Sequence, residues 1–419
     1  MDKTPDIDTN AVTALEAPAP AVPTHGALFS VFRHRNYRLF FTGQTISLIG
    51  FWMQAIAQSW LVYRLTDSPL LLGFVGFASQ APVLFVSPFA GVVADRLNRR
   101  RILLITQTLM MSFATVLALL TLTGLVHVWH IIVIAALAGT ANAFDIPTRQ
   151  SFTVEMVGRG DLPRAITLNS IMFNSARLVG PAMAGFVVGI VGEGWCFALN
   201  AVSYVAVITS LVMMRVMPQT ARTPSHPLTD LRDGFRYVST HPQMRTMLLL
   251  LSTSSFFGAS YLTLMPVFAR DVLHGGSESL GILMSGVGAG ALVGAFVMSR
   301  VRHHNLHRVP MASAALFGLF LIAFSQSTSL VLSVALLVPA GCGLMMQGIS
   351  TNTLIQTVTT DAMRGRVMAY YVMAFMGMMP VGALAAGWLS HQLGVPETVA
   401  LGGLACIACG GIAQFFARK

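Results

Sequence analysis

Long uninterrupted apolar runs alternate with short charged segments along most of the chain. A helix needs roughly 17–25 residues with few charges to cross a bilayer, and twelve runs meet that requirement. A transmembrane barrel would alternate apolar and polar residues over about ten positions, which these runs do not do. The pattern therefore predicts an all-α membrane protein. The expected spans are residues 39–63, 70–94, 102–124, 129–147, 165–191, 195–217, 246–269, 278–299, 309–325, 329–351, 367–390 and 395–416.

The chain also repeats itself at an offset of 200 residues. DLPRAI begins at Asp161 and DAMRGRV begins at Asp361, and a proline with small residues follows each, at Pro181 and Pro380. Two pseudo-symmetric six-helix bundles follow, and parallel repeats of this kind place a substrate site at their interface near the bilayer midplane. We expect a disordered cytoplasmic tail at 1–28, bundles at 29–217 and 246–419, and a cytoplasmic linker at 218–245.

The linker contains PLTDLRDGFRYV, in which apolar residues recur at helical spacing with charges on the opposite side. Leu228, Leu231, Phe235 and Val238 form the apolar side. An amphipathic segment of this kind predicts a short helix along the membrane surface.

Composition and charge agree with this interpretation, since 54% of the 419 residues are hydrophobic and only 10% are charged. With a cytoplasmic N-terminus, every Lys and Arg except Arg64, Arg177 and Arg270 falls in a cytoplasmic segment. The positive-inside rule therefore predicts a multi-pass protein of the inner membrane with both termini in the cytoplasm. The net charge of +10 follows from this topology, and because the arginines are scattered, no nucleic-acid partner is expected.

Charge is concentrated in GVVADRLNRRR, at 91–101, between the second and third spans. The segment matches the G-x-x-x-D-R-x-G-R-R signature of major facilitator superfamily transporters at Gly91, Asp95, Arg96, Arg99 and Arg100. Asn98 replaces the second glycine, and we expect it to tolerate a left-handed backbone there. FDIPTRQSF, LNSIMFNSARLVGPAMAG and NTLIQTVTTDAMRGRVMAYY also resemble one bacterial efflux branch, which contains the enterobactin exporter and macrolide efflux proteins.

This resemblance implies a twelve-helix transporter in which the signature latches the outward-facing state. The alternative for the signature is a cluster of arginines that serves topology alone. By the same resemblance, Gly180 and Pro181 match the exporter motif of the fifth helix. The second half carries a related cytoplasmic motif at Asp361, Arg364 and Arg366.

Polar residues within the first span form a stripe along one side of the helix at 100° per residue. The stripe would be costly against lipid, so we expect it to line a central cavity, with hydrogen bonding between helices as the alternative. Its polar members are Gln44, Ser47, Gln54 and Gln58, and Phe51 lies on the same side.

The fifth span places Ser170, Asn174 and Arg177 on one side, with the arginine well inside the membrane. An intramembrane charge is a functional hypothesis when its partner can be named. One possibility is a bond to backbone carbonyls and to glutamines of the first helix. The other is a carboxylate or catecholate oxygen of the solute.

Asp145 in the fourth span is the candidate for proton coupling, because a carboxylate in low dielectric can have its pKa raised toward neutrality. Arg149, one turn later, is its natural partner, and a permanent ion pair is the alternative role. The sequence contains no P-loop, so the expected energy source is a proton gradient and no cofactor is expected.

These features favour a monomeric, proton-coupled exporter of a siderophore or similar amphipathic small molecule, and not an enzyme. An antibiotic exporter is the alternative, and a methionine cluster at Met373, Met376, Met378 and Met379 is compatible with varied ligands. A membrane sensor or scaffold without transport is a third possibility. The histidines of HHNLH, at 303–307, are expected in a solvated loop and not at a metal site.

Overall fold

The computed structural model describes the backbone of residues 28–215, 227–301 and 303–417. It describes their side chains except at residues 88–89, 91–96, 159, 227–231, 303–305, 361–362 and 415–417. Twelve helices of this part are long and apolar enough to cross a membrane, which confirms the all-α transmembrane fold.

The first half begins with a short 3₁₀ helix and continues with five long helices, of which α6 contains two spans. Gly158 separates these spans with φ 73° and ψ 173°, a backbone conformation that glycine adopts readily. The elements are η1 (Phe29–Arg33), α3 (Arg35–Thr66), α4 (Pro69–Arg96), α5 (Arg99–Leu122), α6 (Val128–Val191) and α7 (Glu193–Met213).

The second half has the same number of spans, but π-helical turns interrupt the first and fifth of them. The linker region contains α8 (Pro227–Thr240), and α9 begins at Pro242, so the expected linker range also includes the first turn of α9. The further elements are α9 (Pro242–Thr253), η2 (Ser254–Gly258), α10 (Tyr261–Val267), η3 (Phe268–Val272), α11 (Ser277–Met298), η4 (His303–Arg308), α12 (Val309–Ser325), α13 (Leu330–Val358), α14 (Asp361–Val372), η5 (Met373–Gly377), α15 (Met378–Leu393) and α16 (Val395–Ala417).

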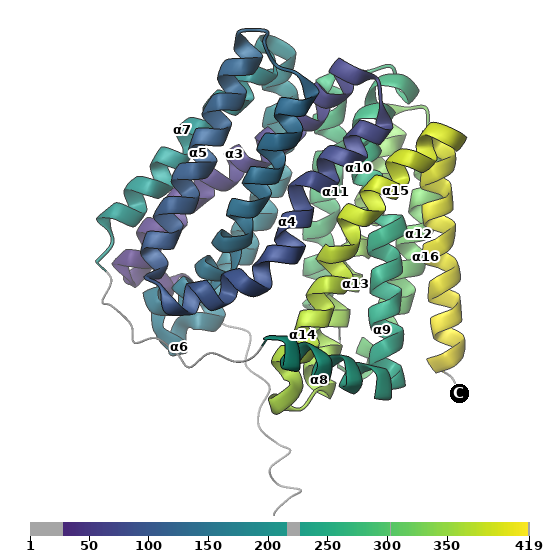
Figure 1. The fold of residues 1–419 in the computed structure, drawn as a ribbon. Helices are drawn as coiled ribbons and strands as arrows, with labels where there is room; N and C mark the ends of the chain where they lie inside the picture. Colours follow the sequence, from purple (N-terminus) through teal and green to yellow (C-terminus); the bar gives the residue numbers. More distant parts are fainter. Residues whose placement is uncertain (1–27, 216–226, 302, 418–419) are drawn as a thin grey trace, which may run out of the picture.

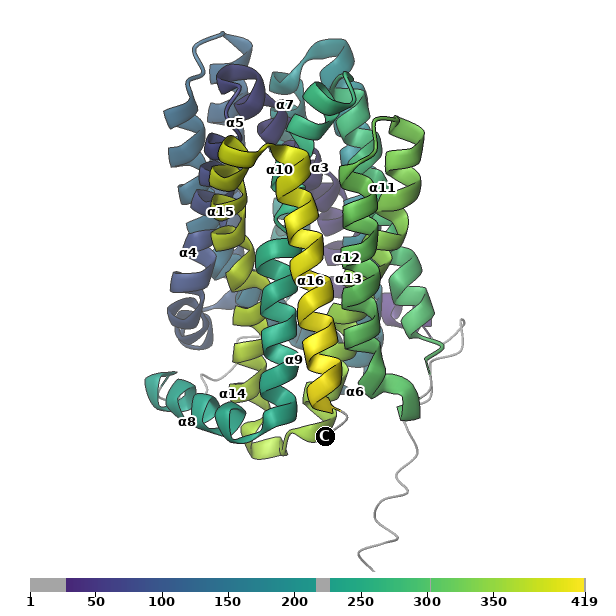
Figure 2. The same cartoon turned by 90° about the vertical axis from the view of Figure 1, so that its right-hand side faces the viewer.

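The spans form two side-by-side bundles, with the first half on the left of Figure 1 and the second half on the right. Helix α8 and the last turn of α16 lie at the same end of the molecule, which we call the linker end; the opposite end is the far end. Helix α8 runs crosswise to the spans (Figure 2), and its Val238 is buried whereas Phe235 is 63% exposed.

The bundles meet along two helix pairs, α4 with α15 and α6 with α11. Glycines permit the close approach. A Cβ atom on Gly73 would lie 2.5 Å from the carbonyl oxygen of Ala383, and one on Gly281 would lie 2.6 Å from that of Pro181. Such small-residue crossings are typical of membrane helices, where packing drives association. Both crossings lie toward the far end, and the bundles diverge toward the linker end (Figure 1).

Candidate functional site

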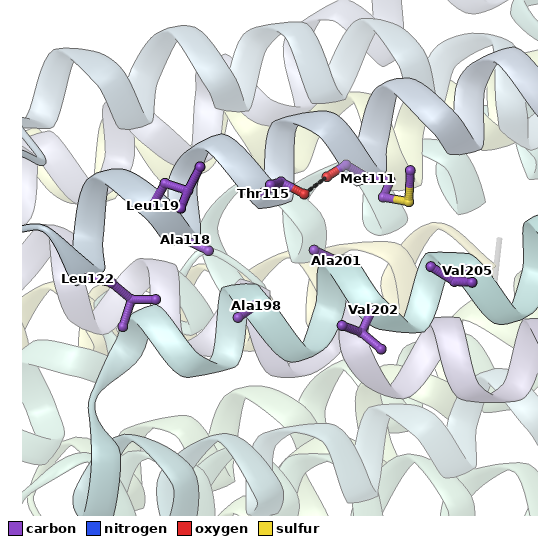
Figure 3. A pocket seen from close by; sticks show the side chains of 9 residues that line it. All are labelled: Met111, Thr115, Ala118, Leu119, Leu122, Ala198, Ala201, Val202 and Val205. Atoms are coloured by element: carbon purple, nitrogen blue, oxygen red, sulfur yellow. Dashed lines mark hydrogen bonds between the residues drawn. The ribbon is translucent and has the colours of Figure 1, made fainter.

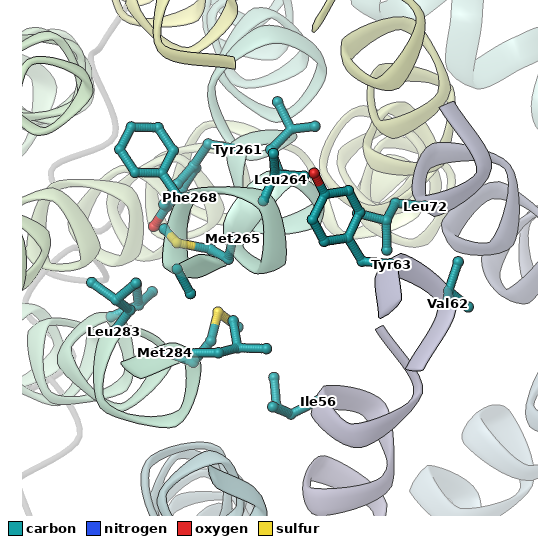
Figure 4. Close-up of a cluster of buried hydrophobic side chains, with 14 of the residues drawn as sticks. Ile56, Val62, Tyr63, Leu72, Tyr261, Leu264, Met265, Phe268, Leu283 and Met284 are labelled. Atoms are coloured by element: carbon teal, nitrogen blue, oxygen red, sulfur yellow. The ribbon is translucent and has the colours of Figure 1, made fainter. Parts of the chain in front are cut away.

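A continuous cluster of buried apolar side chains joins the two bundles in the far half of the molecule (Figure 4). Because the cluster includes side chains from both bundles, it excludes water from the path between them at this level. We call six of its members the far-end seal: Ile56, Tyr63, Leu72, Leu264, Met265 and Met284.

Polar contacts join the bundles beyond the seal. Arg270 of η3 forms an ion pair with Asp67 at 2.6 Å, and the Cζ atom of Arg270 lies 5.2 Å from the centre of the Tyr63 ring. The Tyr63 hydroxyl donates a hydrogen bond to Asp271. Asp67 has a left-handed backbone with φ 47°, which Asp tolerates better than most residues. These contacts hold the far ends of the first and seventh spans together.

Arg177 lies beside Trp52 of α3, with its Cζ atom 5.7 Å from the centre of the indole ring. Within the described part of the chain, its guanidinium forms no hydrogen bond or ion pair. The expected bond to helix-1 glutamines or backbone carbonyls is therefore not formed in this state.

The exporter motif explains how Arg177 comes next to Trp52. A Cβ atom on Gly180 would lie 2.5 Å from the Trp52 Cβ and 3.1 Å from the carbonyl oxygen of Ile49, so only a glycine lets α3 cross α6 here. Pro181 follows it and is buried. The motif thereby fixes the distance between the first and fifth spans at the level of Arg177.

The polar stripe of the first span has mixed surroundings. Gln54 accepts a hydrogen bond of 2.7 Å from Asn200 of α7, which is the contact between helices that was the alternative to cavity lining. Gln44 is buried, and its Oε1 atom has no hydrogen-bond partner among the described atoms. Gln58 is half-buried and Phe51 is exposed. Cavity lining by Gln44 and Gln58 stays a prediction.

The two smaller polar residues of the fifth span bond back to their own helix. The Ser170 hydroxyl donates to the carbonyl oxygen of Ile166 at 2.9 Å, and the Asn174 amide donates to that of Ser170 at 2.8 Å. Such local bonds satisfy the donors without a ligand. Arg177 is thus the residue of this group whose side chain forms no hydrogen bond with the described residues.

Asp145 is buried in the first bundle and lies 3.2 Å from Arg149, as an i,i+4 ion pair. Its other oxygen accepts hydrogen bonds from Thr106 at 3.1 Å and from Gln107 at 2.8 Å, both on α5. The sequence located the arginine partner, but the two partners on α5 depend on tertiary packing.

The arginines of the signature bind within the first bundle. Arg99 pairs with Glu155 of α6, and Arg100 donates to the carbonyl oxygens of Leu211 and Val212 at 2.7 and 2.6 Å, at the end of α7. Cations are favourable at the C-terminal end of a helix.

The prediction of a left-handed backbone at Asn98 is wrong. With φ −65° and ψ 111° it is extended, and its side chain accepts a hydrogen bond from the Arg101 amide and so caps α5. The side chains of Gly91, Asp95 and Arg96 lie outside the described residues, so their part in a latch stays a prediction.

The second cytoplasmic motif contacts the linker helix. Arg366 forms an ion pair of 3.0 Å with Asp233 of α8, and Gly234 packs beneath Tyr370. Arg364 is exposed. The side chain of Asp361 lies outside the described residues.

Asp161 is a residue whose importance the sequence interpretation missed. Its buried carboxylate accepts hydrogen bonds from Arg33 at 2.7 Å and from Arg164 at 2.6 Å, and it lies 2.8 Å from the Nε2 atom of His34. It thereby ties the start of the chain's first span to the fifth span. The repeat of DLPRAI at an offset of 200 residues was the available signal.

A groove with a volume of about 350 Å³ opens between α5 and α7 (Figure 3). Its lining is apolar except for Thr115, whose hydroxyl donates to the carbonyl oxygen of Met111 at 2.8 Å. Since its one hydroxyl is already bonded, the groove suits a lipid acyl chain better than a polar solute.

Two six-helix bundles in parallel repeat, joined by glycine crossings at one end, define a transporter of the major facilitator type. Comparison with known proteins agrees, because the sequence profile described as "Transmembrane secretion effector" matches residues 26–418. The chain therefore belongs to this family of the major facilitator superfamily. The resemblance seen in the sequence is confirmed.

Relatives match nearly the whole chain. The staphyloferrin A transporter of Staphylococcus aureus is 26% identical over 91% of this chain and 96% of its own length. The multidrug efflux pump Tap of Mycolicibacterium fortuitum is 25% identical over 87% of this chain and 91% of its own length.

Solved structures share the fold. A D-xylose–proton symporter has a TM-score of 0.70 at 13% identity, covering 91% of this chain and 97% of its own. A bacterial homologue of the human lysosomal transporter Spinster, in an inward-facing and unoccupied conformation, has a TM-score of 0.67 at 14% identity, covering 92% of this chain and 95% of its own.

Proposed function

We propose that this protein is a monomeric exporter of the inner membrane that moves a siderophore or similar amphipathic small molecule by alternating access. The observation that carries the proposal is that the bundles are joined at the far end and diverge toward the linker end. Alternating access requires such a state. With both termini in the cytoplasm, as the positive-inside rule favours, this state is inward-facing. The names of the relatives support siderophore transport and drug efflux.

The proposed energy source is the proton gradient, coupled through Asp145 and Arg149. Their ion pair is held by Thr106 and Gln107 in a buried position, so a proton that neutralised Asp145 would release Arg149 and alter the packing of α5 against α6. A change of this kind at one bundle is a means of linking protonation to a conformational equilibrium.

The experiment that tests the function is deletion of the gene followed by growth under iron limitation. The deletion strain is expected to release less siderophore into the medium and to accumulate it inside the cell. A plasmid carrying the wild-type gene should restore siderophore release. The Asp95→Asn protein should be inserted into the membrane but should not restore release. Unchanged siderophore levels would remove the siderophore assignment.

A second candidate function is drug export, which the methionine cluster favours. Met373, Met376 and Met378 are 42%, 50% and 37% exposed, and they lie at the π-helical turn that joins α14 to α15. Flexible thioethers adapt to varied apolar ligands. Under this function the deletion strain is more sensitive to antibiotics while its siderophore release is normal. If neither phenotype occurs, a sensor or scaffold role takes precedence.

A further inference from the structure

Three side chains from three helices lie at one level directly beneath the far-end seal. Trp52 precedes the seal residue Ile56 by four positions on α3, and Tyr261 precedes Met265 by four positions on α10. Four residues of α-helix span about 6 Å, so both side chains lie one turn toward the linker end. The Cζ atom of Arg177 lies 5.7 Å from the centre of the Trp52 ring, which places Arg177 at the level of Trp52.

All three side chains have hydrogen-bond donors without acceptors. The indole Nε1 of Trp52 and the hydroxyl of Tyr261 are buried and, within the described part of the chain, have no hydrogen-bond partner. The Arg177 guanidinium likewise forms no hydrogen bond or ion pair there. Indole and guanidinium groups donate only, so they cannot satisfy one another. The Tyr261 hydroxyl can also accept, but it has no hydrogen-bond partner among the described residues. Buried polar groups in native proteins are nearly always paired, and the cluster therefore favours an acceptor from outside the chain.

The acceptor should carry negative charge, because no acid among the described residues forms an ion pair with Arg177 and several acids of the spans have other partners. Asp145 is held by Arg149, Asp67 by Arg270, and Asp271 by Tyr63. An isolated arginine at mid-membrane depth is costly unless a partner or water compensates it. The partner cannot be a side chain that already has another cation or donor.

The surroundings of the cluster are aromatic. The Trp52 ring contacts Phe173 edge to face at 5.7 Å, and the Tyr261 ring lies 6.1 Å from Phe317 and 6.4 Å from Phe324. Apolar walls strengthen a charge-assisted hydrogen bond by lowering the local dielectric. They also provide contact for the apolar part of an amphipathic molecule.

We propose that Trp52, Arg177 and Tyr261 form a site for a carboxylate group of the transported molecule. The inference rests on the proposed function and deepens it, since it selects carboxylate-bearing amphipathic solutes over neutral or cationic ones. Arg177 supplies the charge, and the other two donors orient the carboxylate. Since Tyr261 belongs to the second bundle, a bound carboxylate bridges both bundles at the base of the seal.

The test uses the purified full-length protein in lipid nanodiscs with citrate as the probe and triethyl citrate as its neutral counterpart. Citrate at millimolar concentration should raise the melting temperature and quench tryptophan fluorescence, and triethyl citrate should do neither. Arg177→Gln should weaken citrate binding by about tenfold or more, because hydrogen bonds to charged groups are the stronger class. Trp52→Phe should abolish most of the quenching, and Arg177→Lys should retain part of the binding.

Arg300→Gln is the matched control, because Arg300 also lies over an aromatic ring, 3.6 Å from the centre of Phe296, but is exposed at the linker end of α11. It should bind citrate like the wild type. If Arg177→Gln fails to fold, Tyr261→Phe replaces it as the test, because it removes one donor and keeps the ring. Tyr261→Phe should weaken citrate binding by about fivefold or more.

Two results would overturn the site: equal effects of citrate and its ester on the wild type, or citrate binding by the Arg177 and Tyr261 variants that equals the control. Failure of the proposed site can be distinguished from failure of the proposed function. A protein that binds citrate in this way but exports nothing from cells retains the site and loses the exporter role. One that exports a siderophore while Arg177→Gln has no effect on binding or export retains the role and loses the site.

Discussion

Replacing Gly281 by alanine should push the two bundles apart at the far end and favour the state that opens there. An added Cβ would lie 2.6 Å from the carbonyl oxygen of Pro181 and 3.0 Å from the Cα of Gly185. Ordinary carbon–oxygen contacts are about 3.3–3.6 Å long, so α6 and α11 must separate by roughly 0.7–1 Å. Neither neighbour is a flexible side chain that could move aside.

The cost of such overpacking is about 1–3 kcal/mol. It applies to the state in which the crossing is closed, whereas the gain in helix propensity from glycine to alanine applies to both states and cancels. The equilibrium should therefore shift toward the far-open state by about 5- to 150-fold. Gly411→Ala is the control, since a Cβ there meets nothing within 4 Å.

The assay is labelling of a cysteine placed at Ile56, a seal residue that is 6% exposed, by a membrane-impermeant maleimide added from the far side. Of the four natural cysteines, Cys196, Cys342 and Cys406 are buried and Cys409 is half-buried, and protein without the new cysteine gives the background. Gly281→Ala should label at least about fivefold faster than Gly411→Ala in the same background. Equal rates would refute the view that this crossing keeps the far end closed.

Three further variants test the polar contacts. Asp67→Asn breaks an ion pair whose partners are 67% and 40% exposed, so it should shift the same labelling by at most about 1 kcal/mol, and less at high salt. Asp145→Asn should abolish transport driven by a pH gradient in vesicles while retaining substrate binding; unchanged pH-driven transport would move the coupling elsewhere. Asp161→Asn should lower the melting temperature and expose Arg33 to trypsin, since three bonded groups lose their anion; an unchanged digestion pattern would contradict that role.

The sequence allowed the spans and the local ion pair of Asp145 to be predicted, because both depend on residues close together in the chain. Continuous apolar runs specify membrane helices without reference to their neighbours. An i,i+4 acid–base pair is likewise contained within one helix. The start of α9 at Pro242 and the extended backbone of Asn98 were harder to predict. For Asn98 the reason is that helix caps and left-handed turns favour the same residue types.

The candidate site itself was only partly accessible from the sequence. Arg177 was identifiable as a charge within a span, but its neighbours Trp52 and Tyr261 are aromatic residues like many others in a membrane protein. Their significance comes from unpaired donor atoms, which depend on how three helices pack. Gln54 shows the converse, because a polar residue on the expected side bonds to Asn200 instead. Polarity along a helix indicates which side is buried, and the partner has to come from the fold.

Charge and glycine have different roles at the two ends, and the difference bears on how the protein moves. At the linker end, Asp161, Arg99 and Arg100 tie helices together inside the first bundle. At the far end, Gly73 and Gly281 let the bundles touch each other through backbone contacts, and the polar contacts that cross there, Arg270 with Asp67 and Tyr63 with Asp271, involve partly exposed acids. A rigid-body rotation needs each bundle to be internally fixed and the contact between them to be easily exchanged. Buried charged contacts within a bundle, with glycine crossings and partly exposed polar contacts between bundles, satisfy both conditions. A substrate carboxylate at the base of the seal would then add a bridging energy at the contact that changes during the motion.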